Sequence, residues 1–193
     1  MSLKVHIPES PQTARKWLQT EVEYCTMNNF KYVIINESFG TLSLDELCVD
    51  VNQLNDAKYV YFCYPENGKI ASDIYKFTEY VVNLARQKRV YVLTVSDWFM
   101  HFLNLFIFIG ELTISERKEV MAKQGLNVWI RFDDVEVTKM SYDDEIKMFV
   151  HDPLPLMRHA PPQYDFNLND EMMEWTSEKF VALDLAYDLN RRE

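Results

Sequence analysis

Glycine is scarce in this chain of 193 residues. The four glycines are Gly40, Gly68, Gly110 and Gly125. Loops that wrap around phosphate groups need glycine, because their backbone N–H groups must approach the ligand closely. Neither the pattern G-x-G-x-x-G nor the pattern G-x-x-x-x-G-K-[ST] occurs in the sequence. The scarcity therefore argues against the usual dinucleotide-binding and P-loop chemistry.

Patterns of metal-binding residues are also lacking. The cysteines Cys25, Cys48 and Cys63 are an odd number and lie far apart, so they predict reduced, buried thiols in a cytoplasmic protein. The four histidines show no ligand spacing such as H-E-x-x-H, and the acidic clusters lack the glycine-bearing loop of an EF-hand. We therefore expect no metal site and no cofactor.

Positive charge and long apolar runs are the remaining deficits. The formal net charge is −10, which argues against direct nucleic-acid binding, because phosphates are neutralised by basic surfaces. The longest apolar stretch, residues 98–110, is too short for a bilayer, which needs about 20 residues. The first ten residues lack the apolar run of a secretory signal. The sequence thus predicts a soluble, cytoplasmic protein without a membrane span.

Compact apolar runs alternate with helical patterns in the first half of the chain. The runs KYVIIN, AKYVYFCY and RVYVLTV are apolar at successive positions, which is typical of strands covered on both faces. Ser10 followed by Pro11 predicts the start of a helix. The alternation predicts an α/β fold with a small, doubly wound, Rossmann- or flavodoxin-like parallel sheet. We predict that residues 31–36, 58–64 and 89–95 are neighbouring parallel strands.

The order of elements changes after residue 97. We therefore expect a Rossmann-like core in residues 1–97 and an α-rich extension packed on it in residues 98–193, with a strand near residues 127–137. A proline-rich connection, residues 153–162, holds four of the seven prolines. The stretch WFMHFLNLFIFIG is apolar all around a helix, so Trp98–Ile109 is expected to be buried in the core or at a contact with a second copy or another protein. A final helix rich in methionine and aromatic residues has the same two alternatives.

Two acidic residues stand six positions apart in the stretch SDIYKFTEYVVNLARQKRVYVL. Asp73 and Glu79 are followed by Lys88 and then by the run RVYVL. The stretch resembles the nucleoside 2′-deoxyribosyltransferase-like families, in which a strand leads to Asp-x-Gly-Thr-x-x-Glu, a helix ending in Gly-Lys-Pro-Val, and the next strand. Tyr75 and Lys76 stand where these families have Gly-Thr. The order of elements also agrees, so the resemblance covers about the first half of the chain.

The resemblance implies a site at the carboxyl edge of the sheet. In these families the glutamate attacks the anomeric carbon of the sugar and the aspartate assists at the base, which would make Glu79 the nucleophile and Asp73 its partner. Ligands of such sheets bind at the carboxyl ends of the strands, which are expected at residues 6–10, 36–38, 64–67 and 96–97. The residues expected to contact the ligand there are Asn36, Ser38, Glu66 and Asn67.

Two hypotheses on function remain open. The first is a soluble, acidic protein that binds a nucleoside or nucleotide and cleaves or transfers an N-glycosidic bond. The second is a non-catalytic, acidic interaction or inhibitor protein, of phage or mobile-element type, on a degenerate version of the fold. The matched acids favour the first hypothesis. The scarcity of glycine favours the second, and so does the helical face of Glu79, which lies opposite Ile74 and Phe77 and beside Asn83 and Arg86.

Overall fold

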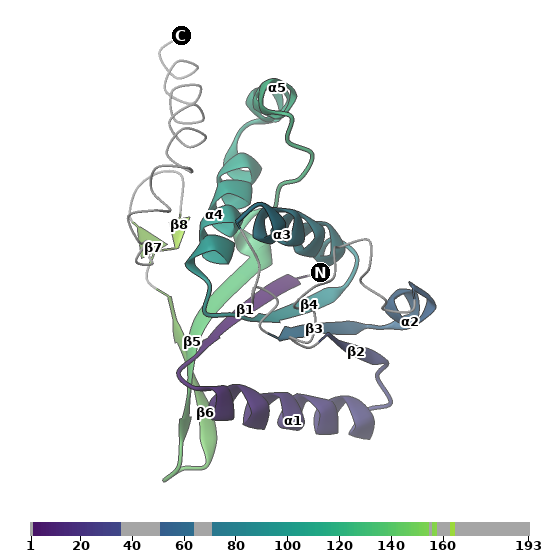
Figure 1. Ribbon diagram of the computed structural model, residues 1–193, viewed down its shortest axis with the longest axis vertical. Helices are drawn as coiled ribbons and strands as arrows, with labels where there is room; N and C mark the ends of the chain where they lie inside the picture. Colours follow the sequence, from purple (N-terminus) through teal and green to yellow (C-terminus); the bar gives the residue numbers. More distant parts are fainter. Residues whose placement is uncertain (1, 36–50, 64–70, 155, 158–162, 165–193) are drawn as a thin grey trace.

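The computed structural model describes residues 2–35, 51–63, 71–154, 156–157 and 163–164. A six-stranded, mostly parallel sheet lies between helices on both of its faces, which confirms the predicted α/β, Rossmann-like class (Figure 1). The elements are β1 (Ser2–Pro8), α1 (Pro11–Met27), β2 (Tyr32–Ile35), α2 (Val51–Asp56), β3 (Tyr59–Cys63), α3 (Ala71–Ala85), β4 (Arg89–Leu93), α4 (Asp97–Glu111), α5 (Ile114–Gln124), the short 3₁₀ helix η3 (Phe132–Asp134), β5 (Val135–Asp143), β6 (Met148–Pro153), β7 (Leu156–Met157) and β8 (Gln163–Tyr164). The last two strands form a separate two-stranded sheet.

The strand order of the large sheet is β2-β3-β4-β1-β5-β6. The first five strands are parallel, and β6 is antiparallel to β5. Tyr32 of β2 pairs with Tyr59 of β3, which in turn pairs with Arg89 of β4. The prediction of three neighbouring parallel strands is therefore confirmed.

The first strand lies in the middle of the sheet, between β4 and β5. From β1 the chain passes through α1 to the distant edge strand β2 and then returns through β3 and β4. In both common doubly wound orders β1 is next to β2, whereas here β3 and β4 lie between them. Because parallel crossovers are right-handed, the outward and returning connections place their helices on opposite faces. Figure 1 shows α1 on one side of the sheet and α3 and α4 on the other.

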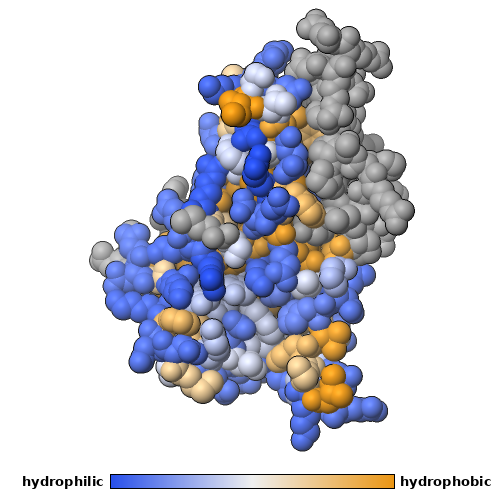
Figure 2. Space-filling view, turned by 180° about the vertical axis from the view of Figure 1, so that it is seen from behind, coloured by the Kyte–Doolittle hydropathy of each residue, from blue (hydrophilic) through white to orange (hydrophobic). Residues whose placement is uncertain are grey.

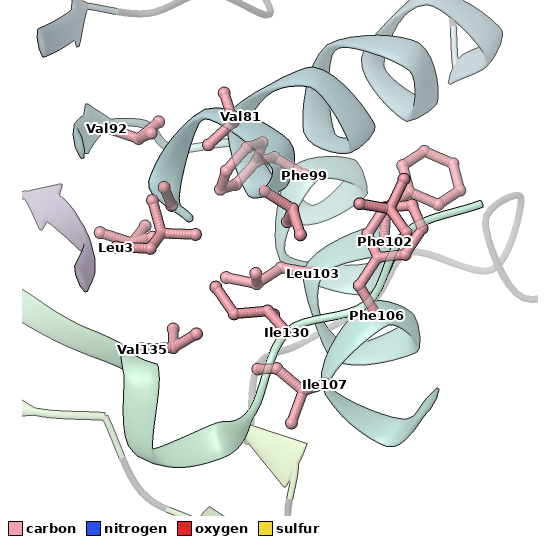
Figure 3. Close-up of a cluster of buried hydrophobic side chains, with 14 of the residues drawn as sticks. Leu3, Val81, Val92, Phe99, Phe102, Leu103, Phe106, Ile107, Ile130 and Val135 are labelled. Carbon is pink, nitrogen blue, oxygen red and sulfur yellow. The ribbon is translucent and has the colours of Figure 1, made fainter. Parts of the chain in front are cut away.

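The two faces of the sheet differ in chemistry, because successive side chains of a strand point to opposite faces. The face toward α3 and α4 is apolar and forms the main core together with the phenylalanines of α4 (Figure 3). The buried strand residues in this core are Leu3, Val5, Ile35, Val60, Phe62, Val90, Val92, Val135 and Val137. The face toward α1 instead carries tyrosines and a histidine. His6, Tyr61 and Tyr91 lie near Trp17 of the helix, and Tyr59 lies beside Tyr91.

The apolar stretch is the helix α4, and it is buried within the chain. All residues from Phe99 to Gly110 are buried. The helix begins at Ser96, whose side chain accepts a hydrogen bond from the N–H of Phe99. The sequence predicted burial either in the core or at a contact with another chain, and the structure shows burial in the core. In the described part of the chain, none of the helices combines the length and apolar character that crossing a membrane requires.

The large sheet continues past residue 97, the expected boundary of the core. Strand β5 pairs with β1 from Leu3↔Val135 to Pro8↔Met140, so it belongs to the same sheet as the N-terminal strands. It begins later than the sequence indicates, because η3 precedes it. The proline-rich connection is described only in part, and the expected C-terminal helix lies outside the described residues.

The hairpin of β5 and β6 projects beyond the sheet. Pairing of β1 with β5 ends at Met140, whereas pairing of β5 with β6 continues to Asp143↔Met148. We call residues 141–150 the β5–β6 arm. One side of this arm packs on α1, since the ring of Tyr142 lies against Phe149 and 3.2 Å from Nζ of Lys16. Figure 2 shows hydrophobic side chains on the projecting arm.

Candidate functional site

Asp73 and Glu79 lie on one continuous helix, α3. Six residues of an α-helix rise about 9 Å and turn the second side chain about 120° away from the first. Both side chains are half-buried. In retaining glycosidases the two carboxyl groups are only about 5–5.5 Å apart, so α3 does not by itself bring these acids together as such a pair. Their catalytic roles remain predictions.

The surroundings of Glu79 are defined by Tyr75, one turn earlier. The ring of Tyr75 packs edge-on against Phe102 of α4, with 5.3 Å between ring centroids, and lies 5.6 Å from Phe106. Burial, and then the negative charge of Glu79, raise the pKa of Tyr75 to about 12. The helix face expected to be solvated is thus partly covered: Tyr75 fills the space between α3 and α4, while Asn83 is exposed.

The four residues expected to contact a ligand, Asn36, Ser38, Glu66 and Asn67, lie outside the described residues. The other two expected strand ends, residues 6–10 and 96–97, are described. Residues 6–10 include the end of β1 and the N-cap of α1, and residues 96–97 are the N-cap and first residue of α4, which follows β4. Strands β1 and β4 are adjacent in the sheet.

These two strand ends form a topological switch point. His6 pairs with Leu93, and the N–H of Thr94 donates to the carbonyl of His6 at 3.1 Å, so the strands remain joined to their ends. Beyond this point β1 leads to α1 on one face and β4 leads to α4 on the other (Figure 1). In open α/β sheets, ligands bind in the crevice outside such a pair of strands.

Hydroxyl and carboxylate groups surround the switch point. Ser10 accepts a hydrogen bond from the N–H of Thr13 at 3.1 Å and thereby caps α1. One carboxylate oxygen of Glu9 accepts from the Thr13 hydroxyl and from the N–H of Tyr142, each at 3.1 Å, which ties the end of β1 to the β5–β6 arm. Asp97 stands in the first turn of α4, and burial raises its pKa. Neither lysine nor arginine occurs in residues 6–13 or 93–98.

A pair of histidines lies on the α1 face of the sheet. The Thr138 hydroxyl is 2.8 Å from Nδ1 of His6 and 3.5 Å from Nδ1 of His151. The hydroxyl can donate to only one imidazole, and a ring that accepts at Nδ1 is neutral, because both ring nitrogens of a protonated imidazole are donors. Burial, followed by His151 and Lys4, lowers the pKa of His6 to about 3. Burial also lowers the pKa of His151.

Sequence reasoning did not predict this histidine pair. His6 and His151 are 145 positions apart, and only strand pairing through β5 brings them together. The sequence indicates only that His6 and Val5 are neighbours in the strand KVHIP and therefore point to opposite faces of the sheet. Over the described residues, no group of three or more His, Cys, Asp or Glu side chains is placed to hold a metal ion. Thr138 therefore links the buried His6 to the exposed His151 in a hydrogen-bonding network.

Comparisons with known proteins do not identify a family. No protein-family model, no curated protein and no solved structure matches this chain. The candidate site at the switch point between β1 and β4 is therefore assigned from its own residues and from the topology of the sheet.

Proposed function

We propose that the protein binds a nucleoside-type ligand at the carboxyl edge of its sheet, in the switch point between β1 and β4. The observation that carries this proposal is the topology: two adjacent parallel strands lead to helices on opposite faces of the sheet. In open α/β sheets, ligands bind outside the carboxyl ends of such a pair of strands.

The chemistry of this edge favours an uncharged nucleoside over a nucleotide. Glu9 and Asp97 are acceptors suited to sugar hydroxyls, as the acidic residue of dinucleotide-binding folds is for ribose. The helix N-termini, which elsewhere bind phosphate, are already capped here by Ser10 and Ser96. A phosphate would also meet the carboxylates without a lysine or arginine from residues 6–13 or 93–98 to neutralise it.

N-glycosidic chemistry is a further step that the family resemblance suggests. Glu79 would attack the anomeric carbon and release the base, which would take a proton from Asp73, and water would then hydrolyse the glycosyl ester. Because the two acids lie far apart along α3, we propose ligand binding and test the cleavage step separately.

Calorimetric titration with nucleosides and with their 5′-monophosphates tests the binding proposal. We expect the nucleosides to bind more tightly than the monophosphates. Asp97→Asn should weaken nucleoside binding about tenfold or more, because a hydrogen bond to a charged group contributes about 1.5–3 kcal/mol. The matched control is Asp56→Asn, since Asp56 is exposed and pairs with Lys31 near the amino ends of β2 and β3, away from the proposed site.

The outcomes separate the two hypotheses. Absence of nucleoside binding, or equal loss in both variants, would contradict the proposal and favour the non-catalytic interaction protein. Release of free base, followed by chromatography, tests the cleavage step on its own. If Glu79 is the nucleophile, Glu79→Ala abolishes base release and leaves the fold intact, because substitution at a helix surface costs about 0.5 kcal/mol or less.

A further inference from the structure

Three arginines from separate parts of the chain lie near the indole ring of Trp129. Arg86 follows α3, Arg117 lies in α5, and Arg131 precedes η3. The guanidinium carbon of Arg117 lies 3.9 Å from the centre of the Trp129 ring, and that of Arg86 lies 4.9 Å from it. Arg86 also donates a hydrogen bond to the backbone carbonyl of Trp129 at 2.7 Å. We call these four residues the Trp129 cluster.

The side chains of Trp129 and Arg131 point outward from the segment between α5 and η3. In this segment Val128 and Ile130 are buried, whereas Trp129 is half-buried and Arg131 is exposed. This alternation is that of an extended chain, in which every second side chain points the same way. Arg86 lies between α3 and the start of β4, and Arg131 precedes η3 and β5, so the cluster lies toward the amino ends of these strands. The nucleoside site is proposed at the opposite, carboxyl edge of the sheet.

Positive charge prevails around these side chains, although the whole chain has a formal net charge of −10. Burial, and then the charge of Arg131, lower the pKa of Arg117, and Arg86 acts in the same direction. Glu111 opposes them, but one of its carboxylate oxygens already accepts a hydrogen bond from the N–H of Phe132 at 3.0 Å. Among the described residues, none of the three guanidiniums forms an ion pair with a carboxylate. The arginines therefore bring more positive charge than the nearby carboxylate neutralises.

We propose that the Trp129 cluster binds the carboxylates of an acidic segment of a partner protein. A guanidinium presents a planar fork of N–H donors that matches the two oxygens of a carboxylate. Stacking on the indole and hydrogen bonds to backbone carbonyls already hold Arg86 and Arg117, so binding costs less of their conformational freedom. These bonds use Nη2 of both side chains and Nε of Arg117, which leaves Nη1 of each to donate to a ligand. Arginine and tryptophan are also enriched among the residues that contribute most to protein interfaces.

The charges around the cluster favour a peptide over a nucleic acid. Glu111 acts on Arg117, and Asp133 and Asp134 follow soon after Arg131, so negative charges interrupt the positive ones. A phosphate backbone has a charge on every nucleotide and would meet these acids, whereas a peptide carries carboxylates only at certain positions. The negative charge of the rest of the molecule acts little on the partner, because salt screens charges beyond about 8–10 Å. The partner that fits is therefore a short acidic segment of a protein.

Titration of the full chain into a fluorescent hexaglutamate peptide, followed by fluorescence anisotropy, tests the proposal. We expect saturable binding that weakens as salt is added. Arg131→Glu should weaken it about tenfold or more, because a carboxylate that repels the peptide replaces a charged donor. Arg131 is exposed and its side chain does not cap η3, so this variant should keep its fold. The matched control is Arg15→Glu, the same change of charge at an exposed residue of α1, on the other face of the sheet.

Two further comparisons test the chemistry of recognition. Arg131→Lys keeps the charge but lacks the planar fork, so it should bind the peptide less tightly than the wild type and more tightly than Arg131→Glu. Hexathymidylate should bind less tightly than the peptide at the same salt concentration. Absence of peptide binding at low salt, or equal weakening by Arg131→Glu and Arg15→Glu, would overturn the proposal. Tighter binding of hexathymidylate would overturn it too, because it would show that the cluster recognises phosphates.

Discussion

Replacement of Gly110 by alanine is the sharpest test of how α4 is packed. A β-carbon at this position would lie 1.9 Å from the carbonyl oxygen and 2.6 Å from the carbonyl carbon of Ile130. Ordinary contacts between carbon and oxygen are about 3.3 Å, so the helix and the backbone at Ile130 would have to separate by more than about 1 Å. Because the obstacle is backbone, it cannot rotate away as a side chain can.

The magnitude follows from three contributions. Overpacking of this kind costs about 1–3 kcal/mol, and the upper value applies where backbone must move. The separation also endangers the hydrogen bond from the N–H of Ile130 to the carbonyl of Phe106, at 3.1 Å, which contributes about 1 kcal/mol. The higher helix propensity of alanine returns up to about 1 kcal/mol. We therefore expect Gly110→Ala to lower the free energy of unfolding by about 3 kcal/mol.

Urea unfolding followed by circular dichroism measures this change, and Gly125 supplies the control. Gly125 ends α5 with φ of 64°, and a β-carbon there would have nothing within 4 Å. Gly125→Ala should therefore cost only about 1 kcal/mol, from the left-handed backbone alone. If Gly110→Ala proves neutral or stabilising, or costs no more than Gly125→Ala, the close approach of α4 to Ile130 is refuted.

Two further predictions concern polar side chains, the half-buried Arg117 and the buried His6. The guanidinium of Arg117 donates to three carbonyls at the end of α4 and lies 3.9 Å from the centre of the Trp129 ring. Arg117→Ala should therefore lower the free energy of unfolding, measured in urea, by about 2 kcal/mol. Arg117→Lys should lower it by less than alanine does, but should not match arginine, because lysine lacks the planar group that donates to several carbonyls at once. Full recovery by lysine would show that charge alone matters. Burial lowers the pKa of His6 from 6.5 to about 3, so the unfolded chain binds a proton on this side chain more readily than the folded chain does. The contribution of His6 to the free energy of unfolding is therefore complete above pH 6.5 and is lost as the pH falls toward 3. The free energy of unfolding should fall by about 1.4 kcal/mol per pH unit over this range, and His6→Gln should flatten the slope; an unchanged slope would contradict the assignment.

The sequence predicted the elements whose pattern is local. The apolar runs of β2, β3 and β4 are buried strands because both faces of a central parallel strand are covered, and their periodicity states this directly. Ser10 and Pro11 start α1, since the cap and the fixed φ of proline act within one turn. The uniform hydrophobicity of α4 likewise indicated burial on all sides, which the structure confirms.

Features that depend on strand pairing could not be predicted in this way. Strand β1 lies between β4 and β5, and the residues of KVHIP do not indicate which strands will be its neighbours. The same pairing brings His6 to Thr138 and His151, and it places the switch point at residues 6–10 and 96–97. The start of β5 was missed because η3 interrupts a run whose alternation looks continuous in the sequence.

The central position of β1 has a consequence for how the chain is made. Strand β1 is synthesised before its neighbours in the sheet, which are residues 89–93 and 135–140. Such pairing between distant segments closes long loops, which makes folding slow. During synthesis, both edges of β1 therefore stay open until β4 and β5 have emerged, and a nascent or truncated chain that stops at residue 97 still lacks the strand that covers one of them. Until residues 135–140 have been synthesised, the open edge of β1 can pair with other chains, which favours aggregation and the binding of chaperones.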